Sequence, residues 1–119
     1  MNTTTINDKD YTLNFGFDFL RVLDERYSIN QNGVAFGFGV QHAVVDLQQK
    51  NPLVLLDLIQ AGTATERQKP SVEGIERFVE REAENGRLDN LFEDFFSQLQ
   101  KQPLTRETAK RMLEAQEEA

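Results

Sequence analysis

The chain has 119 residues, which is the length of one domain of about 100–200 residues. It has 20 acidic against 13 basic residues and a net charge of −7 at pH 7, and such a surface repels nucleic-acid phosphates and anionic lipids, so we expect neither as a partner. It has no cysteine, which excludes disulfides and thiolate metal sites, and no apolar run approaches the about 20 residues that a membrane span requires.

The first 15 residues predict a β-hairpin. Tyr11, Leu13 and Phe15 alternate with polar residues, and the preceding Asn7–Asp10 segment is rich in residues that tolerate turn geometry. A lone hairpin is marginally stable in water, so we expect its apolar face to lie on the rest of the chain. Residues 1–20 lack the basic and then apolar order of a signal peptide, which favours a cytoplasmic protein.

Two amphipathic helices are predicted next, at about 18–27 and 40–50. In each, apolar residues recur at helical spacing: Phe19, Val22, Leu23 and Tyr27 in the first, and Val40, Ala43, Val44 and Leu47 in the second. Between them, residues 28–33 are predicted as a loop from their composition, and in residues 34–39 glycines separate aromatics.

The segment 51–62 is the most apolar of the chain and carries helix start and stop signals. Asn51 is a favourable N-cap, and Pro52 suits the first helical position, where no backbone N–H is needed. Gly62 is expected to end the helix in a left-handed conformation.

Apolar side chains surround this helix almost completely and leave a narrow gap at Asp57 and Gln60. A helix that is apolar all round is buried by its neighbours or by a partner, so we expect it at the centre of the fold. A charged Asp57 in that place must be paired, hydrogen-bonded or turned to water.

Three more helices are predicted at about 71–85, 88–102 and 105–118. The last has few apolar residues and is expected to fray or project. The predicted fold is therefore mainly α (α+β), with an N-terminal β-hairpin packed on a bundle of about five to six helices. We expect a single domain: a hairpin at 1–15, a helical core at 18–102 and a weakly packed C-terminal helix at 103–119.

Catalytic, cofactor and metal sites are not predicted. His42 is the only histidine and falls on the polar side of its helix. No metal-ligand spacing accompanies it. The glycines at 33, 37 and 39 match neither phosphate-binding pattern, and no serine has the context of an activated nucleophile.

Partner binding is the remaining kind of site. The chain has nine phenylalanines, and exposed aromatic clusters mark interfaces. We take Phe96, with Phe92 and Phe95 behind it, as a candidate partner-binding patch, the alternative being that all three are core. Asp57 is the second candidate, the alternative being an aspartate on the one exposed strip of its helix.

Three stretches together resemble the tail assembly chaperones of long-tailed phages of Gram-positive bacteria. The first is a hairpin running into a helix, Ile6–Gly16 and then Phe19–Asp24. The second is the glycine–phenylalanine stretch Gly33–Val40, which leads to Asn51-Pro52 and Leu56–Ile59. The third is the C-terminal stretch Leu99–Thr105. The resemblance extends to Thr105. Asp8 is a departure, because such hairpins often have glycine in the turn.

The resemblance implies a non-enzymatic protein that binds the tape measure protein and keeps it soluble during tail morphogenesis. It also implies recruitment of the tail tube protein, through a frameshifted C-terminal extension in this family, and self-association into a homo-oligomer. We would then expect it in the host cell cytoplasm and not in the mature virion. The alternatives are a structural phage protein (a head–tail connector or tail completion protein) and an acidic DNA mimic, against which the interspersed arginines argue.

Overall fold

The first hairpin closes at Asn7 and Asp8. Both have left-handed backbones, with φ of 53° and 62°, and they join β1 (Thr3–Ile6) to β2 (Lys9–Thr12). A two-residue turn with two positive φ angles is a type I′ turn, which matches the twist of an antiparallel pair without requiring glycine. The predicted hairpin is confirmed for residues 3–12, while residues 1 and 2 of the prediction lie outside the described residues. Tyr11, Leu13 and Phe15 are buried as expected, but Leu13 and Phe15 follow β2 and are not part of the strand.

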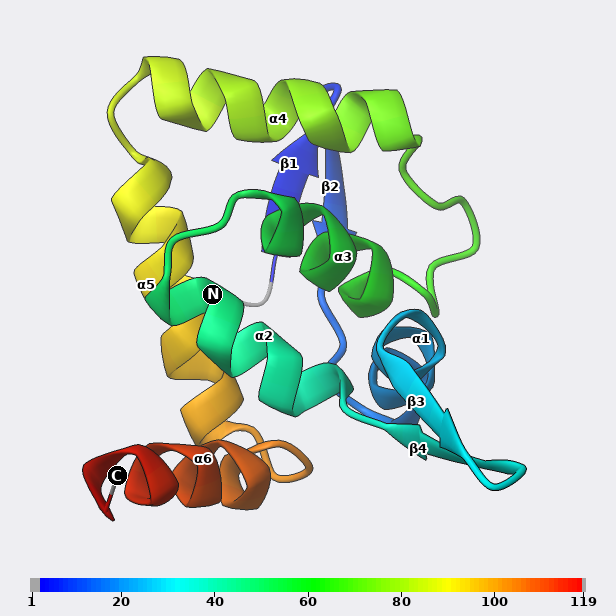
Figure 1. Cartoon of the computed structure of the whole chain (residues 1–119). Helices are drawn as coiled ribbons and strands as arrows, with labels where there is room; N and C mark the ends of the chain where they lie inside the picture. The colour runs from blue at the N-terminus through cyan, green and yellow to red at the C-terminus, as the bar shows by residue number, and fades with distance from the viewer. Residues whose placement is uncertain (1–2, 119) are drawn as a thin grey trace.

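The structure, a computed structural model, describes residues 3–118, and these form six helices and two antiparallel hairpins (Figure 1). Each predicted helix is confirmed to within two residues at either end. The helices are α1 (Phe17–Arg26), α2 (Gly39–Gln48), α3 (Leu53–Gly62), α4 (Val72–Glu84), α5 (Leu88–Lys101) and α6 (Arg106–Glu118).

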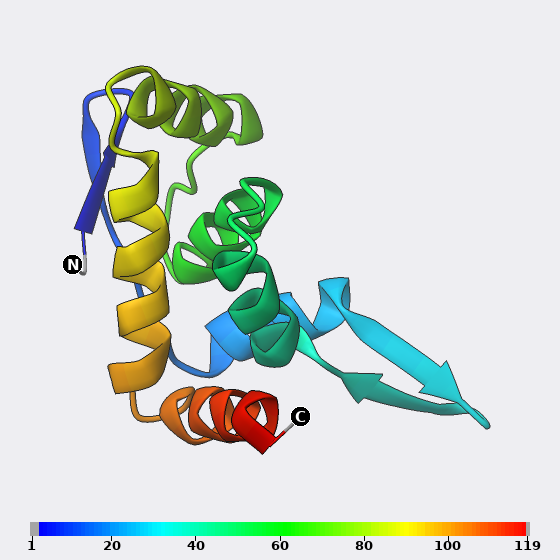
Figure 2. The ribbon, with the colours of Figure 1, turned by 60° about the vertical axis from the view of Figure 1, so that its left-hand side comes forward.

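Helix α3 lies at the centre of the arrangement, in contact with α1, α2 and α4. Helices α4 and α6 cross opposite ends of α5, and the first hairpin stands beside α4 (Figures 1 and 2). The predicted central burial of α3 holds for most of its length, because Val54, Leu55, Leu58 and Ile59 are fully buried. Leu53 is the exception, with 66% of its surface exposed at the start of the helix.

The two ends of α3 differ from the ends that the sequence predicts. Asn51 Oδ1 accepts from the Leu53 N–H at 3.1 Å, as expected of a capping side chain. The helix nevertheless begins at Leu53, and Pro52 takes the N-cap position, one residue later than predicted. The predicted left-handed Gly62 is wrong, because Gly62 is the last helical residue and has no positive φ. Its carbonyl accepts from the Asn14 N–H at 2.8 Å, and an added Cβ would lie 3.0 Å from Leu13 Cδ2. Glycine is needed there for close approach.

Residues 28–33, predicted as a loop, belong to a second hairpin. It pairs β3 (Ser28–Gln31) with β4 (Val34–Gly37), and Asn32 and Gly33 form its turn with φ of 53° and 80°. Asn-Gly is the preferred sequence of a type I′ turn, so the loop prediction is wrong: this turn pairs the two flanking segments despite their loop-like composition. The hairpin projects from the helices as an arm (Figure 2), and all its strand residues are exposed.

Helix α6 does not project, contrary to expectation, but lies against α2 and α5. Thr105, at the end of the preceding turn, is buried and donates to the Leu99 carbonyl at 2.7 Å. The amides of Gln48 and Gln116 exchange hydrogen bonds of 2.8 and 2.9 Å. Among the described side chains of α6 only Ala109 is fully buried, so the weak packing of this helix stays a prediction.

Candidate functional site

An apolar hollow of about 240 Å³ opens on the surface between α2 and α5. It is lined by Leu47, Gln48, Lys50, Phe92, Glu93 and Phe96. Leu47 and Phe92 belong to the core, and Phe96 is partly exposed beside them. The volume is below the roughly 300–1,000 Å³ of small-molecule sites. The hollow therefore suits one or two apolar side chains of a partner better than a free ligand.

The rim of this hollow is polar. Lys50 pairs with Asp89 at 2.9 Å, and both side chains are mostly exposed. The end of α2 fixes the position of Lys50, whose φ is 57°, because the N–H groups of Lys50 and Asn51 donate back to carbonyls of the last helical turn. A polar rim around an apolar centre is the arrangement of protein–protein interfaces.

The three predicted phenylalanines take different places. Phe95 is fully buried, with its ring centroid 6.5 Å from that of Phe15, and Phe92 is 3% exposed. Phe96 reaches the surface, while Phe92 contributes to the hollow from below. A role of Phe92, Phe95 and Phe96 in partner binding stays a prediction, and the geometry favours Phe96 as the member a partner would touch first.

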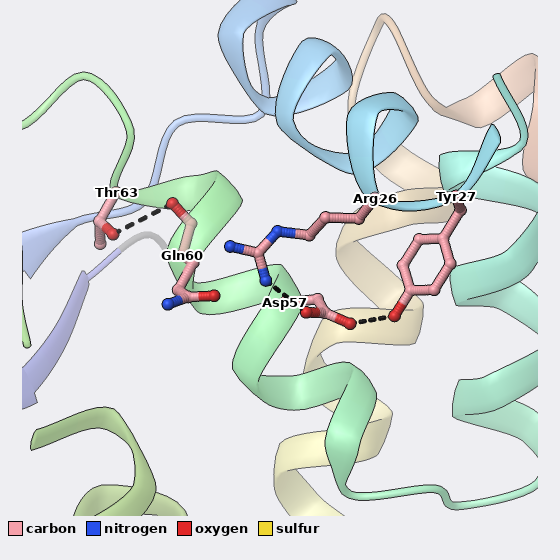
Figure 3. A network of polar contacts seen from close by, with 5 residues as sticks. All are labelled: Arg26, Tyr27, Asp57, Gln60 and Thr63. Carbon is pink, nitrogen blue, oxygen red and sulfur yellow. Dashed lines mark hydrogen bonds and ion pairs between the residues drawn. The ribbon is translucent and has the colours of Figure 1, made fainter. Parts of the chain in front are cut away.

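Asp57 faces α1 and accepts hydrogen bonds from two consecutive residues there. The Arg26 guanidinium lies 2.6 Å from one carboxylate oxygen, and the Tyr27 hydroxyl donates to the other (Figure 3). The Asp57 side chain is 17% exposed. Asp57 is therefore paired and hydrogen-bonded within the chain and is not turned to water. A role of Asp57 in partner binding stays a prediction.

Tyr27 contacts both Asp57 and a histidine on α2, His42. Burial, together with the hydrogen bond to Asp57 and its negative charge, raises the pKa of the Tyr27 phenol well above its usual range. Its ring stacks on that of His42 at 3.8 Å between centroids, and His42 Nε2 lies 2.8 Å from an Asp46 oxygen. The i,i+4 spacing of His42 and Asp46 was readable from the sequence, but the stacking was not.

No metal-binding cluster is found among residues 3–118: no three His, Cys, Asp or Glu side chains come together in a way that could hold an ion. Within the same range, no helix is long and apolar enough to cross a membrane.

The comparison with known families decides the identity. The sequence model for the phage tail assembly chaperone protein (TAC) matches residues 3–114. The chain belongs to the phage tail assembly chaperone family. This family is non-enzymatic, and its members act with tail proteins. No curated protein and no solved structure matches the chain.

The extent of the match bears on the last helix of this chaperone. The resemblance noted in the sequence stopped at Thr105, whereas the family match continues through most of α6. Most of helix α6 therefore lies within the part of the chain that the family model describes.

Proposed function

We propose that this chaperone binds apolar segments of the tape measure protein and keeps that protein soluble until tail tube subunits assemble around it. Membership of the family supports a tail-protein client, and the hollow between α2 and α5 supplies a surface of the right chemistry. A helical client would place an apolar side chain over Phe96 and Leu47, with polar neighbours facing the rim.

The proposal includes a place and a time for the protein. It acts in the host cell cytoplasm, leaves the tail as the tube forms, and is absent from the mature virion. Tail tube protein is recruited to the same complex, through a C-terminal extension where the gene is frameshifted. Mass spectrometry of purified virions tests this part. Stoichiometric amounts in the particle would instead identify a head–tail connector or tail completion protein.

Co-expression with tape measure fragments tests client binding. The chaperone should keep the fragments in the soluble fraction and be recovered with them by affinity capture. Phe96→Ser, which removes the apolar wall of the hollow, should weaken capture by about tenfold. Phe17→Ser is the matched control, because Phe17 is 64% exposed on α1 and does not line the hollow.

A second variant approaches the hollow without removing any core contact. Glu93 is exposed at the rim, and Glu93→Trp would place a large ring over the opening. It should reduce capture as Phe96→Ser does while unfolding at the wild-type temperature. If fragments remain insoluble with the wild-type protein, client binding is wrong; if both hollow variants capture normally, the hollow is not the client surface.

A further inference from the structure

A second apolar hollow, of about 150 Å³, opens between the start of α3 and α4. It is lined by Pro52, Leu53, Leu56, Glu76, Val79 and Glu80. Val79 belongs to the core and Leu56 packs against it, whereas Leu53 is 66% exposed. The α3–α4 hollow shares no lining residue with the hollow between α2 and α5. It therefore leaves separate apolar surface in water that a partner's side chain would cover.

The rim of the α3–α4 hollow is acidic. Glu76 and Glu80 stand one helical turn apart on α4, and both are exposed. Neither takes part in any of the ion pairs found within residues 3–118. Like charges at i and i+4 of a helix repel each other. Cations placed beside these two carboxylates would relieve that repulsion.

The arginines of α4 do not neutralise this rim. At 100° per residue, Arg77 and Arg81 fall about 100° round the helix from Glu76 and Glu80. Arg77 lies 3.8 Å from Glu73, and Arg81 lines a different surface, with residues of β1. The side of α4 that borders the hollow is therefore locally acidic, in a chain whose net charge is already −7.

The charge of the surroundings reverses at the other end of α3, near Gln60. A neighbouring hollow of about 220 Å³ includes Gln60, Arg26 and Lys69 in its lining. Arg26 is already paired with Asp57 (Figure 3), so Lys69 supplies the positive charge of this end. Cations of a partner are thus attracted to the Leu53 end of α3 and repelled from the Gln60 end.

Apolar surface with an acidic border selects a cationic amphipathic partner. We infer that the α3–α4 hollow docks a helix of another protein, which seats an apolar side chain against Leu53 and Leu56. Two Lys or Arg side chains at i,i+4 of that helix stand about 6 Å apart, the spacing needed to face Glu76 and Glu80. Nucleic acid would bring phosphates to this border and a second copy of the chain is itself acidic, so neither fits as well.

A synthetic peptide tests the docking. The probe is an amphipathic helix of about 18 residues, long enough to form in water, with a leucine flanked by two lysines at i,i+4 on the same face. NMR titration of the isotope-labelled chain with this peptide should give saturable shifts of the amides of residues 53–56 and 76–80. The amides around Phe96 should not shift. A peptide with glutamates in place of the lysines should bind at least about tenfold more weakly.

Charge variants test the rim. Glu76→Gln combined with Glu80→Gln should raise the dissociation constant of the lysine peptide by about tenfold. The matched control is Glu114→Gln combined with Glu117→Gln on α6, which crosses the opposite end of α5 from α4 (Figure 1). It changes the net charge equally and should bind the peptide like the wild-type protein. All four carboxylates are on exposed residues, so both double variants should keep the wild-type circular dichroism spectrum.

Leu53→Ser tests the apolar contact and should also weaken peptide binding by about tenfold. Leu104→Ser is the control, because Leu104 is 41% exposed and lies outside the hollow. The inference does not rest on client binding, so Phe96→Ser should bind the peptide like the wild-type protein. It is overturned if the wild-type chain shows no saturable shifts, if the shifts centre on the α2–α5 hollow, or if the glutamate peptide binds equally well. Variants of the α3–α4 hollow that bind like their controls would also overturn it.

Discussion

The carboxylate of Asp57 is shared by Arg26 and Tyr27, the residues that end α1. The Arg26–Asp57 distance is 2.6 Å, and the Tyr27 hydroxyl donates to the second oxygen (Figure 3). Since Tyr27 directly precedes β3, this contact ties α3 to the base of the second hairpin as well as to α1. One side chain of the central helix therefore anchors two elements.

Asp57→Ala should lower the free energy of unfolding by about 1–3 kcal/mol, because Tyr27 and Arg26 both lose their acceptor in a partly buried place. Asp18→Ala is the control. It removes the Arg21–Asp18 ion pair, whose side chains are 69% and 52% exposed, and should cost less than about 1 kcal/mol. Urea unfolding followed by circular dichroism measures both. Equal effects would show that the Asp57 contacts add nothing beyond a surface pair.

The same variant also tests Asp57 as a partner-binding residue. If Asp57→Ala lowers the free energy of unfolding as expected but still captures tape measure fragments at low temperature, the role of Asp57 is structural. If stability is unchanged and capture is lost, the partner meets Asp57 directly.

Tyr27 should ionise at a higher pH than a free tyrosine, whose pKa is about 10. Burial raises the Tyr27 pKa most, and the Asp57 hydrogen bond and charge raise it further. The folded state thus holds this proton more tightly than the unfolded state. The contribution of this proton to the free energy of unfolding is therefore complete below a pH of about 10, and it is lost as the pH rises through the raised pKa of Tyr27.

Tyrosinate absorbance measures this ionisation directly, because the chain has two tyrosines and no tryptophan. Tyr27→Phe leaves Tyr11 alone and so assigns the two titrations. Asp57→Asn should lower the Tyr27 pKa part of the way, since it removes the charge but leaves the burial. A Tyr27 titration at the free-tyrosine value in the wild-type protein would contradict the Asp57 contact.

The helices were predictable because their signals are local. Periodic apolar residues and caps such as Ser71, which accepts from the Gly74 N–H at 3.0 Å, lie within a few positions of one another. The second hairpin was also locally encoded, by Asn32-Gly33, but its exposed strands lack the apolar alternation that indicates a strand. The partners of Asp57 were not predictable, because they stand 30 and 31 positions away and their meeting depends on how α1 packs on α3.

The aromatic residues illustrate the same limit. Phe92, Phe95 and Phe96 all fall on or beside one stripe of α5, and helical periodicity alone does not separate core from surface at its margin. Tertiary packing separates them: Phe96 stays partly exposed beside α2, whereas Phe95 is fully buried with its ring against Phe15. The use of Gly62 for close approach is likewise visible only once Leu13 lies against it.

Gly39→Ala should destabilise the protein by about 1–3 kcal/mol, because the new methyl group would press on the backbone of α1 at Leu23. Gly16→Ala is the comparison. Its methyl group would press only on the end of the Asn14 side chain, 2.9 Å from Oδ1, and that side chain can rotate away at the loss of the hydrogen bond that it accepts from the Gly16 N–H. Thermal unfolding should rank Gly39→Ala below Gly16→Ala. The reverse order would mean that the base of the second hairpin is not held against α1 at Gly39.

Phe95→Ala and Phe96→Ala should separate the core from the candidate partner surface. Phe95 is fully buried against Phe15, so its truncation should cost about 3–5 kcal/mol and reduce client capture only through unfolding. Phe96 is partly in water already, so its truncation should cost less than about 2 kcal/mol.

The decisive comparison is capture of tape measure fragments at a temperature where both variants remain folded by circular dichroism. Under that condition Phe95→Ala should bind like the wild-type protein, while Phe96→Ala should bind more weakly. A binding loss in Phe95→Ala alone would place the client contact deeper than the hollow and require α5 to move away from α2 when the client binds. Equal binding by both variants and the wild-type protein would remove α5 from the client surface altogether.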